Sequence, residues 1–162
     1  MEIEEGGGWV AFVEAGRQGG GMNDVRGPVL LYDGECGLCR ALVRRLARAD
    51  RRRVLRFAPL QGAFAQSALR RCGLPTTDFD SLVFLPAADG AEHHLRTAGV
   101  IAALTCLGGV WRAAGRALAM VPGRWRDAAY KCVARVRYRI FGQVAFRPGE
   151  PLDPARRDRF LS

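Results

Sequence analysis

The sequence predicts an α/β protein whose mixed sheet is built in the order β-α-β-α-β-β-α. Three observations carry this prediction: short apolar runs of strand length, intervening segments with helical periodicity, and glycine or proline at most boundaries. The chain has 162 residues, of which 49% are hydrophobic, and it shows no internal repeat. These totals are typical of one globular domain.

The first half of the chain contains two strand–helix units. The run PVLLYD is short and apolar, as expected of a buried strand, and Gly34 ends it. In the helix that follows, Leu38, Leu42 and Leu46 fall on one face while arginines occupy much of the remainder. The predicted elements are a strand at 28–33, a helix at about 36–49, a strand at 54–60 and a helix at 63–74.

The second half predicts a hairpin and more helices. Asp89 and Gly90 suit the turn between two antiparallel strands. The predicted elements are strands at 81–88 and 91–97, a helix at 97–109, and helical residues at 110–142 with a break at 121–123. A β-α-β opening followed by an antiparallel hairpin is the layout of a thioredoxin or glutaredoxin core.

These elements predict four regions. Residues 1–27 are glycine-rich and predict a flexible extension, within which Met22 is an alternative translation start. Residues 28–109 form the thioredoxin-like core, residues 110–142 a helical extension packed on it, and residues 143–162 an irregular tail.

Composition restricts the cellular setting. The longest apolar stretch, 100–111, is too short for a bilayer span, which needs roughly 20 residues. The acidic, glycine-rich start does not resemble a signal peptide, so we expect a cytoplasmic protein. The net charge of +9 comes from 24 arginines and one lysine. Such an arginine-rich, lysine-poor composition is typical of a GC-rich bacterial genome and is weak support for nucleic-acid binding.

The sequence CGLC places Cys36 and Cys39 at the start of the first predicted helix. Only a thiolate attacks a disulfide, and the helix N-terminus stabilises negative charge on Cys36. Arg40, one turn further on, adds a positive charge, so we expect it to stabilise the thiolate. Cys39, nearer the predicted buried face, suits a resolving thiol. Asp33 is expected to act as a proton acceptor or as a helix cap.

Three other interpretations remain. A zinc site would need further ligands, and Cys72, Cys106 and Cys132 are scattered on helices where they suit the core. The run LLYDGE resembles the nucleophile motif of haloacid-dehalogenase-type phosphotransferases only poorly. The basic helical C-terminal part favours instead a module that binds an acidic protein, an anionic membrane surface or nucleic acid, with a non-catalytic or redox-sensing cysteine pair.

The motif DGECGLC at 33–39 resembles the signature of the DCC family, predicted thiol-disulfide oxidoreductases named for one Asp and two Cys. The likeness continues through RFAPLQG at 56–62, TAGVIAAL at 97–104 and the segment at 121–142, and so covers roughly residues 28–142. The resemblance implies a thioredoxin-like fold and dithiol-disulfide chemistry by Cys36 and Cys39, with a supporting Asp33 and no cofactor. It also places Tyr130, Arg137 and Tyr138 in the family pattern without giving them a purpose. Expected partners are a protein disulfide or small thiol and a cellular thiol reductant.

Overall fold

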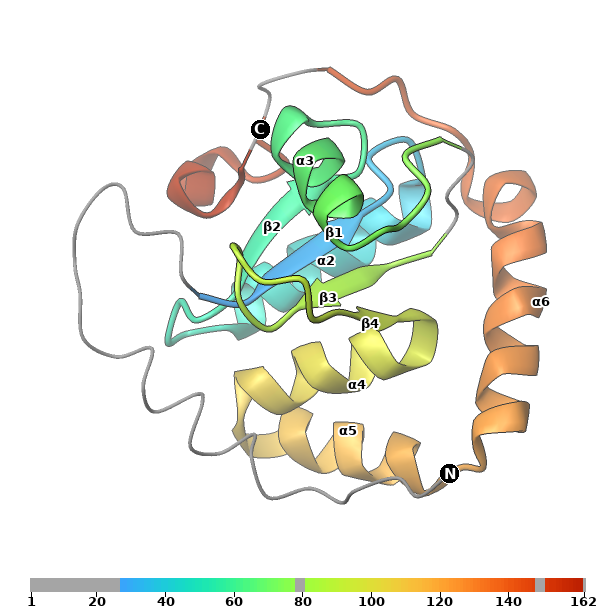
Figure 1. Cartoon of the computed structure of the whole chain (residues 1–162). Coiled ribbons are helices and arrows are strands. Elements are labelled where there is room, and N and C mark those ends of the chain that lie inside the picture. The colour runs from blue at the N-terminus through green and yellow to red at the C-terminus, as the bar shows by residue number, and fades with distance from the viewer. Residues whose placement is uncertain (1–26, 78–80, 148–150, 162) are drawn as a thin grey trace.

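A computed structural model of the chain describes residues 27–77, 81–147 and 151–161. A four-stranded mixed sheet lies at its centre, in the order β2-β1-β3-β4 (Figure 1). β1 pairs in parallel with β2 and antiparallel with β3, and β3 pairs antiparallel with β4. The strands are β1 (Val29–Tyr32), β2 (Arg56–Pro59), β3 (Val83–Leu85) and β4 (His94–Leu95).

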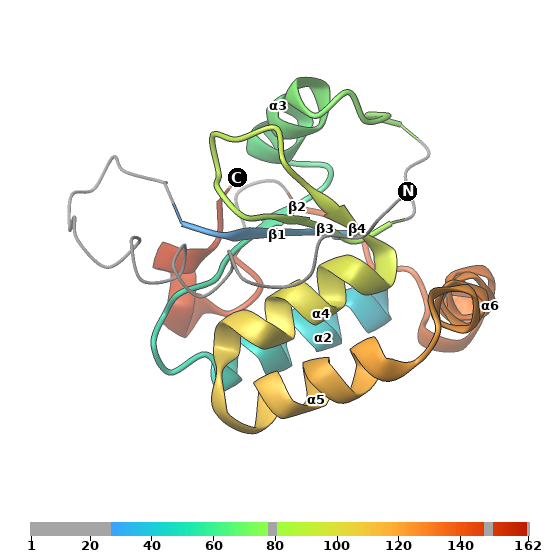
Figure 2. The same ribbon diagram turned by 60° about the horizontal axis from the view of Figure 1, so that its bottom comes forward.

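Helices cover both faces of this sheet. Figure 2 shows α3 on one face, with α2, α4 and α5 on the other. The helices are α2 (Gly37–Ala49), α3 (Ala63–Arg71), α4 (Arg96–Leu107), α5 (Gly109–Met120) and α6 (Gly123–Phe141), followed by a short 3-10 helix, η1 (Pro154–Arg159). The element order and strand directions confirm the predicted α/β, thioredoxin-like fold. The predicted extension, including Met22, lies outside the described residues except for Gly27.

Alternation along the strands divides the core into two layers. Leu30 and Tyr32 of β1 pack with Val43 and Leu46 of α2 and with α4, on one face of the sheet. Val29 and Leu31 point to the opposite face and pack with α3. Because both faces of β1 are covered, the strand reads in the sequence as a continuous apolar run. The turn that follows β1 therefore starts from a rigid, central strand of the sheet.

The end of the chain differs from the predicted irregular tail. Residues 154–159 form η1, and the backbone N–H of Leu161 donates to the carbonyl of Phe57 in β2 (2.8 Å). Arg159 is buried, pairs with the buried carboxylate of Asp50, and donates to the carbonyl of Leu55. β2 is an edge strand, and an exposed edge is unfavourable, so the tail serves as its cover. The sequence predicted no such role, because the three prolines of the tail indicated an irregular segment.

The long helix α6 crosses beside α2 and α4 and ends near the start of α2 (Figures 1 and 2). Two polar contacts fix its course. The hydroxyl of Thr97 in α4 donates to the carbonyl of Arg126 (3.4 Å), and the N–H of Leu82 donates to the hydroxyl of Tyr130 (2.9 Å). No helix within the described ranges is long and apolar enough to span a membrane.

Candidate active site at the start of helix α2

The two cysteines of the CGLC motif lie where β1 ends and α2 begins. Cys36 is the N-cap residue of α2, and its Sγ accepts the backbone N–H of Cys39 (3.4 Å). Hydrogen bonds from helix-terminal N–H groups stabilise a thiolate, so this contact favours negative charge on Cys36. Both cysteines are free thiols in the structure. The spacing of one helical turn thus brings the pair together, as the sequence predicts.

The burial of the two thiols is the reverse of the expected order. Cys36 is 0% exposed, whereas Cys39 is only half-buried. The prediction that Cys39 lies nearer the buried face is therefore wrong. The helical pattern correctly placed α2 but could not show that its N-cap residue is buried, because this residue lies against a distant part of the chain.

The loop that carries Cys36 pairs with a C-terminal strap, residues 141–144, which begins at the last residue of α6. The N–H of Gly37 donates to the carbonyl of Gly142 (3.3 Å), and the N–H of Val144 donates to the carbonyl of Glu35 (2.9 Å). The strap thus pairs antiparallel with the loop that carries the first cysteine. It lies so close that a Cβ on Gly37 would stand 2.3 Å from the carbonyl oxygen at the end of α6. Only glycine fits there without moving the strap.

Asp33 is the centre of a polar network beside the cysteines and is 5% exposed. Its Oδ1 accepts the N–H of Glu35 (2.9 Å) and the side-chain amide of Gln61 (3.0 Å). Its Oδ2 accepts the hydroxyl of Tyr138 and pairs with the guanidinium of Arg137 (3.2 Å). Four donors thus surround this carboxyl group and hold it in one position. The N-cap of α2 is the first cysteine, so the helix-cap interpretation of Asp33 is wrong.

Arg137 joins this network to the second thiol. Its Nη1 lies 3.7 Å from Sγ of Cys39, its Nη2 lies 3.1 Å from the hydroxyl of Tyr138, and the side chain is 4% exposed. Sequence reasoning assigned no task to Arg137, Tyr138 or Gln61. An arginine followed by a tyrosine near the end of the last predicted helix was the available signal, but arginines are too common in this chain for one of them to be informative.

Arg40 occupies a different place from the one its spacing suggests. Its Nη1 donates to the carbonyl of Gly34 (3.2 Å), which fixes the turn before the first cysteine. The guanidinium that reaches a sulfur atom of the pair is that of Arg137. The expected role of Arg40 in stabilising the thiolate stays a prediction.

Burial and neighbouring charges shift the pKa values of two groups in the site, Cys39 and Tyr138. Burial above all, together with the hydrogen bond and charge of Cys36 and the charge of Asp33, raises the pKa of Cys39 to about 12, and the charge of Arg137 opposes this rise. Burial and the hydrogen bond to Asp33 likewise raise the pKa of the Tyr138 phenol. Near neutral pH the second thiol and the phenol therefore hold their protons beside a buried carboxylate.

The other cysteines lie away from this site. Cys106 is buried in the core and Cys72 is half-buried, whereas Cys132 is exposed on α6, so its predicted core position is wrong. Within residues 27–77, 81–147 and 151–161, no group of three or more His, Cys, Asp or Glu side chains is placed to hold a metal ion.

Known proteins resemble the part of the chain that holds the sheet, the cysteine pair and the polar network around Asp33. The family model of DCC1-like thiol-disulfide oxidoreductases matches residues 30–143. The uncharacterized protein YuxK of Bacillus subtilis (strain 168) is 36% identical over 115 residues, 71% of this chain and 81% of that protein. A chloroplastic DCC family protein of Arabidopsis thaliana is 28% identical over 116 residues, 72% of this chain and 66% of that protein. No solved structure matches. The chain therefore belongs to the DCC1-like thiol-disulfide oxidoreductase family.

Proposed function

We propose that the protein is a thiol-disulfide oxidoreductase that cycles between a Cys36–Cys39 dithiol and disulfide. The observation that carries this proposal is the helix-capping position of Cys36, whose Sγ accepts the N–H of Cys39. Membership of the family is consistent with this chemistry. The substrates in this proposal are protein disulfides or low-molecular-weight disulfides, met in the cytoplasm.

In the reductive direction, the Cys36 thiolate attacks one sulfur of a substrate disulfide. The substrate S–S bond breaks, a mixed disulfide forms, and the first substrate sulfur leaves as a thiolate. Cys39 then loses its proton and attacks Sγ of Cys36. The second substrate sulfur leaves as a thiolate and the Cys36–Cys39 disulfide forms. The departing substrate thiolates take up the protons that the two cysteines released, so two electrons and two protons have passed to the substrate. A cellular thiol reductant returns the pair to the dithiol by the same exchange.

The buried network supplies what the second step needs. Cys39 must become a thiolate despite a pKa raised to about 12, and the guanidinium of Arg137, 3.7 Å away, is the group that opposes that rise. Asp33 holds this guanidinium in place through the ion pair at 3.2 Å. We assign Asp33 a positioning role rather than that of proton acceptor, because its Oδ2 already pairs with the guanidinium of Arg137 and accepts the hydroxyl of Tyr138.

The first step requires that the strap move. Cys36 is 0% exposed beneath residues 141–144, so a substrate sulfur reaches it only after the strap retreats from the loop. The strap contacts the loop through backbone groups, and Phe141 and Val144 remain 49% and 41% exposed. A local opening of this kind costs far less than unfolding the domain.

The test compares three cysteine variants in the glutathione-driven reduction of a model protein disulfide. Cys36→Ser should abolish exchange, and Cys39→Ser should trap the mixed disulfide with substrate. Cys132→Ser, on the exposed face of α6, is the matched control and should keep the activity of the unaltered protein. Equal activity in the first two variants would refute the assigned roles, and full activity in both would refute the proposed function.

A further inference from the structure

Helix α5 and the start of α6 carry several exposed large apolar side chains. Val110 is 77% exposed, Met120 is 84% exposed and Trp125 is 64% exposed. The opposite side of α5 packs closely on α4, where a Cβ on Gly115 would stand 3.3 Å from Leu104. Large exposed apolar groups on two consecutive helices favour an interaction surface in this part of the molecule.

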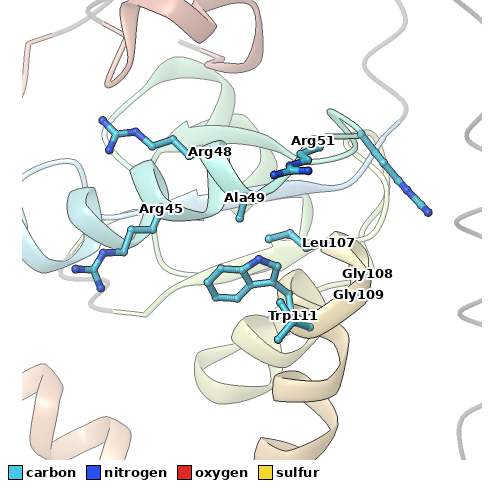
Figure 3. A pocket seen from close by; sticks show the side chains of 10 residues that line it. Arg45, Arg48, Ala49, Arg51, Leu107, Gly108, Gly109 and Trp111 are labelled. Carbon is cyan, nitrogen blue, oxygen red and sulfur yellow. The ribbon is translucent and has the colours of Figure 1, made fainter.

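Arginines lie close to the apolar side chains at the start of α5. A groove of about 800 Å³ lies between the end of α2 and the start of α5, and its lining includes Ala49, Leu107 and Trp111. The same groove is lined by four arginines, Arg45, Arg48, Arg51 and Arg52, and by no acidic residue. Figure 3 shows Trp111 in the groove, with Arg45 to one side and Arg51 to the other. The nearby Asp50 is buried and paired with Arg159, so it does not neutralise the groove.

We propose that this face docks on an anionic phospholipid membrane surface, with α5 against the interface and the groove arginines on lipid phosphates. Guanidinium groups bind phosphate bidentately, and tryptophan is favoured at the boundary between headgroups and acyl chains. An arginine-rich face with exposed aliphatic and indole side chains is typical of an interfacial helix. Nucleic acid would complement the arginines but would leave Val110 and Met120 without partners. A free anion would fill the groove and leave α5 uncovered.

The docking face is separate from the cysteine pair. The pair lies at the N-terminal end of α2 and the groove at its C-terminal end, and α2 has 13 residues. At 1.5 Å per residue the two ends are about 20 Å apart. The docking face and the cysteine pair are therefore separate parts of the surface, so each can be altered without the other. This inference goes beyond the proposed redox function and stands or falls independently of it.

Vesicle co-sedimentation tests the inference with the full chain. We expect binding to vesicles of 70% phosphatidylcholine and 30% phosphatidylserine that weakens with salt, and no binding to pure phosphatidylcholine vesicles. The variant Arg45→Glu/Arg48→Glu should lose about ten-fold or more in affinity. The control Arg135→Glu/Arg139→Glu makes the same charge change on the exposed side of α6 and should lose about three-fold or less.

A second readout separates insertion from charge attraction alone. Met120→Asp should weaken binding to the anionic vesicles, and a blue shift of tryptophan emission on binding should shrink in Trp125→Phe. The proposal is overturned if anionic vesicles do not bind, or if both arginine pairs matter equally. It is also overturned if a DNA duplex binds where vesicles fail, or if light scattering shows a dimer that Met120→Asp dissociates. In every variant the redox titration of the cysteine pair reports on the other function.

Discussion

Gly37→Ala should expose the first thiol by displacing the strap at residues 141–144. A Cβ at this position would stand 2.3 Å from the carbonyl oxygen of Phe141, whereas ordinary contact begins at 3.4 Å, so the strap must retreat by about 1 Å. Two backbone hydrogen bonds hold the strap to the loop, and each contributes about 1 kcal/mol net. Loss of both corresponds to roughly a 30-fold increase in the open population. The alkylation rate of Cys36 should rise by up to this factor.

The assay is iodoacetamide labelling of the reduced protein, with the Cys36 peptide quantified by mass spectrometry. Val144→Pro offers an independent route, because it removes the N–H that donates to Glu35. Gly90→Ala is the matched control, since a Cβ there meets its nearest atoms at an ordinary 3.5 Å. If both strap variants fold normally, as judged by circular dichroism, and label Cys36 no faster than the control, the strap does not govern access.

Three further outcomes follow from the buried groups. Alkylation of Cys39 should keep rising through pH 10 without a plateau, because its pKa is raised to about 12; a plateau near pH 9 would contradict this. Arg137→Met removes the guanidinium that lowers this pKa, so mixed disulfides with substrate should accumulate in gels run without reductant; unchanged resolution would exclude Arg137 from the second step. Arg159→Met leaves Asp50 buried without its partner and should lower the free energy of unfolding in urea by about 3–5 kcal/mol. Arg156→Met breaks a more exposed pair and should cost at most about 1 kcal/mol; equal losses would refute the argument.

Local pattern in the sequence was enough to predict the core of the fold. The apolar run of β1 and the periodic Leu42, Val43 and Leu46 place the first strand and helix within one or two residues of their observed bounds. The fourth strand is shorter than predicted, His94–Leu95, because α4 already begins at Arg96. Such boundaries depend on packing, which the sequence pattern does not contain.

The sequence predicted only those residues of the site that lie close together along the chain. Asp33, Cys36 and Cys39 lie within seven consecutive residues at the junction of β1 and α2, so spacing alone places them together. Arg137 and Tyr138 come from α6, about a hundred residues later, and reach the site because the crossing of α6 brings its last turns to the start of α2. Periodicity shows which side of a helix is apolar, not which distant loop its polar residues will meet.

The central claim is that Cys36 and Cys39 form a reversible redox pair, and the most direct test is their alkylation state across a series of glutathione redox buffers. Mass spectrometry should show the reversible loss of two hydrogens confined to this pair, with a single midpoint that gives its reduction potential. Thiols that stay reduced in every buffer, or that react only after a chelator is added, would contradict the claim.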